Sequence, residues 1–143
     1  MEKAQSVFIA IGIGLLALVA GGLANMGIVN AGAEMWPVDP QFNLKTMAGL
    51  EAALPTFTTV QLLYPVLAHA VGTLVSALIV ARWGRWPVFS AYLFAGLFFL
   101  GGLQMVIALP APVWMEALDL AVAYFPMAWL ALRAQQRTAQ QPA

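Results

Sequence analysis

The sequence has little charge, no cysteine and a single histidine. Only 8% of its 143 residues are charged, and six basic and six acidic side chains leave no formal net charge. Soluble domains carry about 25% charged residues, so this chain cannot cover a globular surface with polar groups. A lipid bilayer is the solvent in which such a surface is stable. Because 62% of the residues are hydrophobic, we predict an integral membrane protein.

These absences also exclude several kinds of site. Without cysteine the chain has no disulfide, no thiolate nucleophile and no cysteine-ligated zinc or iron–sulfur cluster. A chain with no net charge lacks the basic surface that nucleic-acid binding needs. One histidine is too few for a histidine-rich metal or haem site, and no glycine-rich phosphate loop is present. We therefore expect no metal, no cofactor and no nucleic-acid partner.

Four apolar runs are long enough to cross the hydrocarbon of a bilayer, which takes about 20 helical residues. They cover about residues 7–29, 56–81, 87–109 and 112–132. The predicted fold class is therefore all-α, an integral membrane four-helix bundle. Its single transmembrane domain covers residues 1–133, and residues 134–143 form a polar cytoplasmic tail.

The first run has an alternative interpretation as a cleaved signal peptide. Lys3 would then be its basic segment, and Ala31-Gly32-Ala33 has the spacing of a cleavage site. The apolar segment of a signal peptide has about 7–15 residues, and the run over residues 7–29 is longer. We therefore expect a membrane span at this position.

The basic residues predict how the bundle is oriented. Five of the six lie at the N-terminus, in the second connection or near the C-terminus: Lys3, Arg82, Arg85, Arg133 and Arg137. The positive-inside rule assigns that side to the cytoplasm. Both termini are therefore predicted to be cytoplasmic.

One long connection, over residues 35–55, separates the first two runs on the opposite, outer side. Asp39 followed by Pro40 is typical of a helix N-cap with proline in the first turn. Met47, Leu50 and Leu54 then recur at helical spacing. This pattern predicts a short amphipathic helix that lies on the outer membrane surface.

Polar residues within the spans are the candidate functional residues, because an ionisable side chain in a bilayer is costly unless it is paired or hydrated. His69 lies in the middle of the second run, and Asp119 about one turn outside the middle of the fourth. The candidate ligand-binding residues are His69, Asp119, Gln104, Asn25, Gln61 and Thr73. Their depths suggest a polar pocket that opens toward the outside.

A purely structural role is the alternative for each of these residues. Asn25 and Gln104 are of a type that commonly hydrogen-bonds a neighbouring membrane helix, which contributes roughly 0.6–2 kcal/mol. His69 could donate to a backbone carbonyl or to Asp119. Pro65 and Pro126 lie within spans, where each is expected to produce a kink because it lacks an amide proton.

Several short motifs occur along the chain: Asp39-Pro40, Ala52-Ala53-Leu54-Pro55, Ala68-His69-Ala70-Val71-Gly72-Thr73, Leu109-Pro110-Ala111-Pro112-Val113-Trp114 and Tyr124-Phe125-Pro126-Met127-Ala128. Together they resemble those of a group of small uncharacterised bacterial inner-membrane proteins with four transmembrane helices. The resemblance implies a bacterial inner membrane. It implies no activity.

Three function classes remain open. The first is a structural or accessory membrane subunit that forms a homo-oligomer or joins a larger membrane complex, which small size and stripes of small residues favour. The second is a transport or small-ligand-binding bundle with an outward-opening polar pocket around His69 and Asp119. The third is a membrane enzyme that acts on a lipidic substrate, with His69 and a carboxylate as acid and base. The sequence favours them in that order.

Overall fold

The structure, a computed structural model, describes residues 2–139 of the chain. In chain order its elements are α1 (Glu2–Met35), α2 (Met47–Ala53), the 3₁₀ turn η1 (Leu54–Thr56), α3 (Thr59–Trp83), α4 (Pro87–Ala108), α5 (Val113–Val122) and α6 (Phe125–Ala139). All the regular elements within the described range are helical, which confirms the predicted fold class.

Four stretches are long and apolar enough to cross a membrane. They are Gln5–Met35, Thr59–Trp83, Pro87–Ala108 and Val113–Thr138. The fourth stretch consists of α5 and α6 together. Four such helical stretches identify the chain as a membrane protein.

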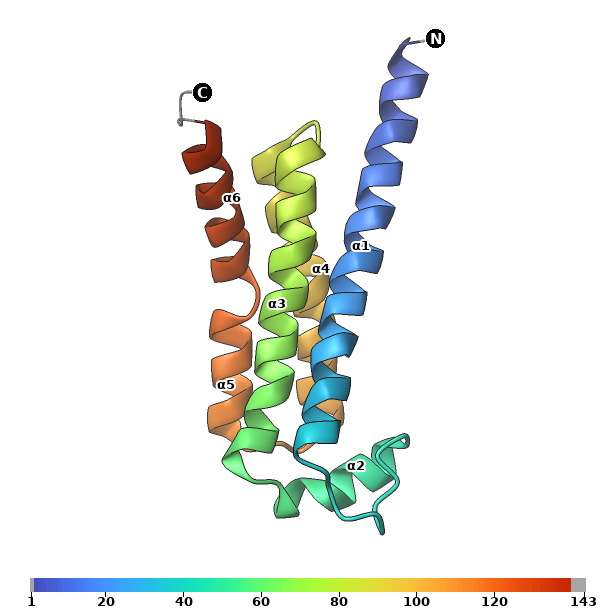
Figure 1. The fold of residues 1–143 in the computed structure, drawn as a ribbon, viewed down its shortest axis with the longest axis vertical. Coiled ribbons are helices and arrows are strands. Elements are labelled where there is room, and N and C mark those ends of the chain that lie inside the picture. Colours follow the sequence, from blue (N-terminus) through green and yellow to red (C-terminus); the bar gives the residue numbers. More distant parts are fainter. Residues whose placement is uncertain (1, 140–143) are drawn as a thin grey trace.

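Helix α3 is the centre of the bundle. It packs against α1 on one side and against α4, α5 and α6 on the others. Figure 1 shows the two ends of the described chain at the same end of the bundle, with α2 at the opposite end. This arrangement is what an even number of crossings requires.

The interior is built mainly from small side chains. One core cluster consists of Ala17, Ala77, Val80, Ala91, Phe94, Ala95, Ala128 and Ala131. Many larger apolar side chains face outward instead, including Phe8, Leu23, Phe89, Leu100 and Ile107, each more than half exposed. Alanine lets helix backbones approach closely, and lipid tolerates an apolar exterior.

Helices α1 and α3 approach each other closely. A Cβ atom at Gly21 would lie 2.6 Å from the carbonyl oxygen of Gly72, and one at Gly72 would lie 2.8 Å from the carbonyl oxygen of Gly21. Next to this crossing, the Ser76 hydroxyl donates to the carbonyl of Ala17. Glycine is therefore needed at both positions, since any side chain would force the two backbones apart.

The short helix expected between the first two spans is present as α2, but the predicted N-cap was wrong. Thr46 is the N-cap, and its hydroxyl accepts a hydrogen bond of 3.1 Å from the amide of Gly49. The Asp39 carboxylate instead accepts from the amide of Gln41, at 3.0 Å, within a separate turn. Aspartate stabilises such a turn as readily as a helix start, so its position alone did not locate the helix.

The fourth span is discontinuous. α5 ends at Val122 and α6 begins at Phe125, where the sequence predicted one run with a kink. Pro126 has no amide proton, and its ring would clash with the carbonyl of Val122 in a continuous helix. In the structure Pro126 lies in the first turn of α6, where an amide would have no helical partner.

The first residues of the predicted polar tail are helical. α6 continues to Ala139, beyond the start of that tail at residue 134. Glutamine and arginine are good helix formers, so the helix extends past the apolar run. Residues 140–143 of the predicted tail lie outside the described residues.

The glycine crossing generates a first prediction. Gly21→Ala should lower the free energy of unfolding of the purified protein by about 1–3 kcal/mol, because the new methyl group collides with α3. Gly22→Ala is the matched control, since a Cβ there meets nothing within 4 Å. Unfolding in mixed micelles, followed by circular dichroism, measures both variants. Equal stability of the two variants would contradict the assigned crossing.

Candidate functional site

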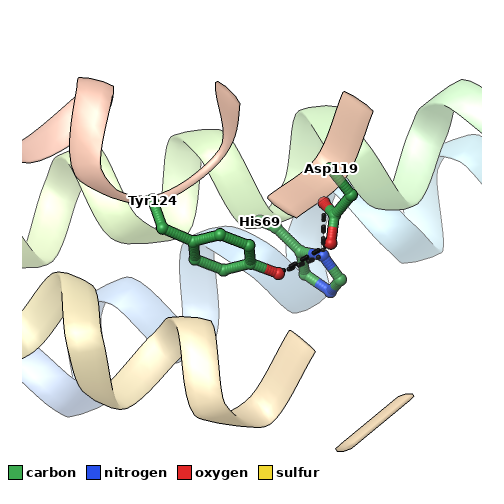
Figure 2. Close-up of polar contacts among 3 residues, drawn as sticks. All are labelled: His69, Asp119 and Tyr124. Carbon is green, nitrogen blue, oxygen red and sulfur yellow. Dashed lines mark hydrogen bonds and ion pairs between the residues drawn. The ribbon is translucent and has the colours of Figure 1, made fainter. Parts of the chain in front are cut away.

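Three side chains from separate elements meet in the middle of the bundle. His69 comes from α3, Asp119 from the last turn of α5, and Tyr124 from the break before α6. His69 Nδ1 lies 2.9 Å from Asp119 Oδ1, and the Tyr124 hydroxyl donates to Asp119 Oδ2 at 2.8 Å. The same hydroxyl oxygen lies 3.0 Å from His69 Nδ1 (Figure 2). Each member of this cluster therefore contacts the other two.

The break in the fourth span is what brings Tyr124 to Asp119. Residues five apart on a continuous α-helix point about 140° away from each other. Because the helix stops after Val122 and restarts at Phe125, the Tyr124 side chain turns back toward the carboxylate. The Tyr124 carbonyl also accepts from the amides of Met127 and Ala128, and so caps the start of α6.

Helix α4 holds the tyrosine ring in place. Tyr124 is completely buried, and the ring of Phe99 meets its edge at a centroid distance of 5.6 Å. A Cβ atom at Gly102 would overlap the Tyr124 hydroxyl oxygen. Gly102 thus provides the space that the hydroxyl occupies.

The surroundings decide the charge state of the cluster. An ionised Asp119 beside a neutral His69 would leave an uncompensated negative charge within the membrane, which costs several kcal/mol. In the described part of the chain, Asp119 contacts no basic side chain other than His69. A second proton on the pair removes the net charge. In a pair that is neutral overall, with one proton between Oδ1 and Nδ1, the other proton is on Nε2.

In such a neutral pair, His69 presents an N–H donor on its free side. Figure 2 shows Nε2 pointing away from the carboxylate and the phenol. The His69 side chain keeps 22% of its exposure, compared with 5% for Asp119. Asp119 and Tyr124 thus fix the ring from one side while its other nitrogen stays accessible.

The accessible side of His69 belongs to a groove of about 360 Å³ between α1 and α4. Leu18 and Asn25 line it from α1, and Leu97, Phe98, Gly101, Gly102 and Met105 line it from α4. These residues lie along the lengths of the helices, so the groove opens on the side of the bundle. The sequence instead predicts a pocket that opens toward the outside, at the end of the bundle that carries α2.

The six residues proposed from the sequence separate into two groups. The structure brings His69 and Asp119 together, and Asn25 lines the same groove as His69. Gln104 is exposed and does not line the groove. Thr73 is buried, and its hydroxyl has no hydrogen-bond partner among residues 2–139. Gln61 closes the capping box of α3 with Thr58 and donates to the carbonyl of Trp36 at 3.2 Å.

Two members of the site were not identified from the sequence. Neither Tyr124 nor Gly102 was among the candidate residues named from the sequence. The sequence does contain one signal for the role of Tyr124, which is that Pro126 follows it by two residues within a span. A proline at this position favours a break in the helix, and the break turns the tyrosine toward the carboxylate. Nothing in the sequence alone indicates that Gly102 faces Tyr124.

Among residues 2–139, no three His, Asp or Glu side chains lie close enough to hold a metal ion. Comparisons of the chain with protein-family models, with curated proteins and with solved structures find no match. The site therefore has to be interpreted from its own geometry.

The crowding at Gly102 generates a second prediction. Gly102→Ala should displace the Tyr124 hydroxyl and break its hydrogen bond to Asp119. The chain has one histidine, so nitrogen NMR of histidine-labelled protein reports on His69 alone. We expect the Nδ1 resonance to shift in Gly102→Ala, and Tyr124→Phe to shift it in the same direction.

Gly96→Ala is the control for this experiment. Gly96 lies in the same helix, and a Cβ there meets nothing within 4 Å. Its spectrum should match that of the wild type. A Gly102→Ala spectrum that is also unchanged would show that Tyr124 does not contact the histidine.

Proposed function

We propose that this membrane protein binds a small amphiphile in the groove between α1 and α4, with the polar end of the ligand at His69. The observation that carries the proposal is that the two ring nitrogens of His69 have different surroundings. Nδ1 is held by Asp119 and Tyr124, whereas Nε2 is left for a partner on the groove side. A histidine that served only packing would not need one free, fixed nitrogen.

The walls of the groove support an amphiphilic ligand. Leu18, Leu97 and Met105 are apolar and partly exposed, and together they border the groove on both helices. An alkyl chain or ring could pack against them while its head group reached His69. Because the groove opens on the side of the bundle, such a ligand would enter directly from the bilayer. The volume of the groove falls within the usual range of about 300–1,000 Å³ for ligand sites.

The proposal places the protein in a bacterial inner membrane, with both termini in the cytoplasm. The positive-inside rule supports this orientation. Near that end of the bundle the guanidinium of Arg133 lies 4.0 Å from the ring centroid of Trp129, and that of Arg85 lies 5.0 Å from Trp86. Paired arginine and tryptophan side chains are favourable where hydrocarbon meets the head groups.

An accessory subunit of a larger membrane complex, or a homo-oligomer, is the second candidate. The observation that favours it is the position of α1, which packs extensively against α3 alone and leaves much of its apolar surface uncovered. Lipid can cover that surface as well as protein can. The free nitrogen of His69 has no role in an accessory subunit, and for this reason we rank ligand binding first.

An enzyme that acts on a lipidic substrate is the third candidate. His69 beside Asp119 has the geometry of a general base held by a carboxylate. Within the described part of the chain, however, the residues that line the groove include no serine, threonine or cysteine nucleophile. Any reaction there would need the ligand to supply the attacking group.

The groove gives a third prediction. Gly101→Leu should fill it without a collision, because a Cβ at Gly101 meets nothing within 4 Å. Native mass spectrometry of the gently purified protein should detect a bound amphiphile in the wild type. In Gly101→Leu its occupancy should fall at least roughly fivefold, a loss of about 1 kcal/mol in binding free energy.

Gly96→Leu is the matched variant. Gly96 lies on another face of α4, where its side chain would point into a different, shallow surface hollow. It should retain the ligand as the wild type does. Equal occupancy in all three proteins, or an empty wild type, would overturn the proposed function.

A further inference from the structure

The two polar groups of the groove have opposite hydrogen-bonding character. In a His69–Asp119 pair that is neutral overall, Nε2 is the nitrogen that carries a proton toward the groove and donates. Asn25 Oδ1 is buried and has no hydrogen-bond partner in the described part of the chain, so it lacks a donor. A buried acceptor without a partner costs about 1–3 kcal/mol. A ligand group that accepts from His69 and donates to Asn25 would satisfy both.

The charge of the groove restricts the ligand further. No Lys, Arg, Asp or Glu is among the described residues that line it. The one carboxylate nearby, Asp119, is already paired with His69 and Tyr124. A phosphate, carboxylate or ammonium group would therefore enter the membrane interior without a counter-charge, which is strongly unfavourable.

We infer that the groove takes an uncharged amphiphile whose head group is a hydroxyl, either an alcohol or a phenol. A hydroxyl has one donor proton and two acceptor lone pairs, so a single oxygen can serve Nε2–H and Asn25 Oδ1 together. A ketone or an ether accepts but cannot donate, and would leave Asn25 unsatisfied. This inference rests on the proposed function, because it names the ligand class of that site.

The position of Asn25 agrees with this assignment. Its Cβ lies 3.0 Å from where a Cβ of Gly72 would be, one turn along α3 from His69. The α1–α3 crossing therefore holds the amide against the helix that carries the imidazole. Both residues line the same groove, which favours a compact head group over an extended one.

Photoactivatable hexadecyl probes test the inference in phosphatidylcholine nanodiscs. Three probes share the same chain and diazirine and differ only in their head group: an alcohol, its methyl ether and a carboxylic acid. We expect saturable labelling of the groove by the alcohol, with an affinity roughly tenfold higher than that of the ether, as one hydrogen bond implies. The acid should bind more weakly than the ether.

The variant Asn25→Leu should abolish the preference for the alcohol over the ether, because it removes the acceptor that only the alcohol can satisfy. Gln104→Leu is its control, because it removes an exposed amide that does not line the groove. Gln104→Leu should therefore keep the tenfold preference.

The outcomes separate the two claims. Saturable labelling by the alcohol and the ether with equal affinity would overturn the hydroxyl assignment and leave ligand binding intact. Preferential labelling by the acid would overturn the charge argument and with it the ligand class. Labelling that does not saturate with any probe, or that Gly101→Leu does not reduce, would overturn the proposed function itself.

Discussion

The missing amide proton of Pro126 is the constraint on which the rest of the site depends. Because the fourth span cannot continue as one helix past the carbonyl of Val122, it ends as α5 and restarts as α6. The break turns Tyr124 toward Asp119, and these two residues fix the ring of His69 from one side. The free nitrogen of that ring and the groove beside it follow from this orientation. Discontinuous helices at mid-membrane depth frequently form binding sites in membrane proteins.

The bilayer imposes the second constraint, which concerns charge. A buried carboxylate needs a compensating proton or cation, and His69 is the basic group that contacts Asp119 in the described structure. The pair can be neutral only if it holds two protons, and the shared geometry leaves one of them on Nε2. Overall neutrality of the His69–Asp119 pair therefore both stabilises the cluster and gives the groove its hydrogen-bond donor. Replacement of either His69 or Asp119 by an apolar residue would leave the other one unpaired within the bilayer, where lipid cannot solvate it.

The fold could be predicted from the sequence in most respects. The scarcity of charge and the four apolar runs were sufficient for the membrane bundle, and the spacing of Met47, Leu50 and Leu54 for the short helix. These features are properties of long segments, in which many residues point to the same conclusion. The N-cap of α2 and the break in the fourth span each depend on one or two residues, for which several local structures are nearly equal in energy.

The site could be predicted only in part. His69, Asp119 and Asn25 were identifiable because polar groups are costly within a span, and no tertiary information was needed. Gln61 and Gln104 satisfied the same criterion, but one caps a helix and the other is exposed. Tyr124 and Gly102 could not be assigned, since their roles arise from contacts between α4 and the broken span. Depth in the membrane can be inferred from sequence, whereas the rotation of one helix against another cannot.

The most direct test is an experimental structure of the purified protein crystallised from a lipid phase, at a resolution that shows ordered ligands. The account predicts that the Asp119 carboxylate contacts both Tyr124 and His69 Nδ1. It also predicts density in the groove with a polar atom within hydrogen-bond distance of Nε2. A continuous fourth helix, with Tyr124 turned away from Asp119, would contradict the account. So would a groove in which Nε2 is covered only by hydrocarbon.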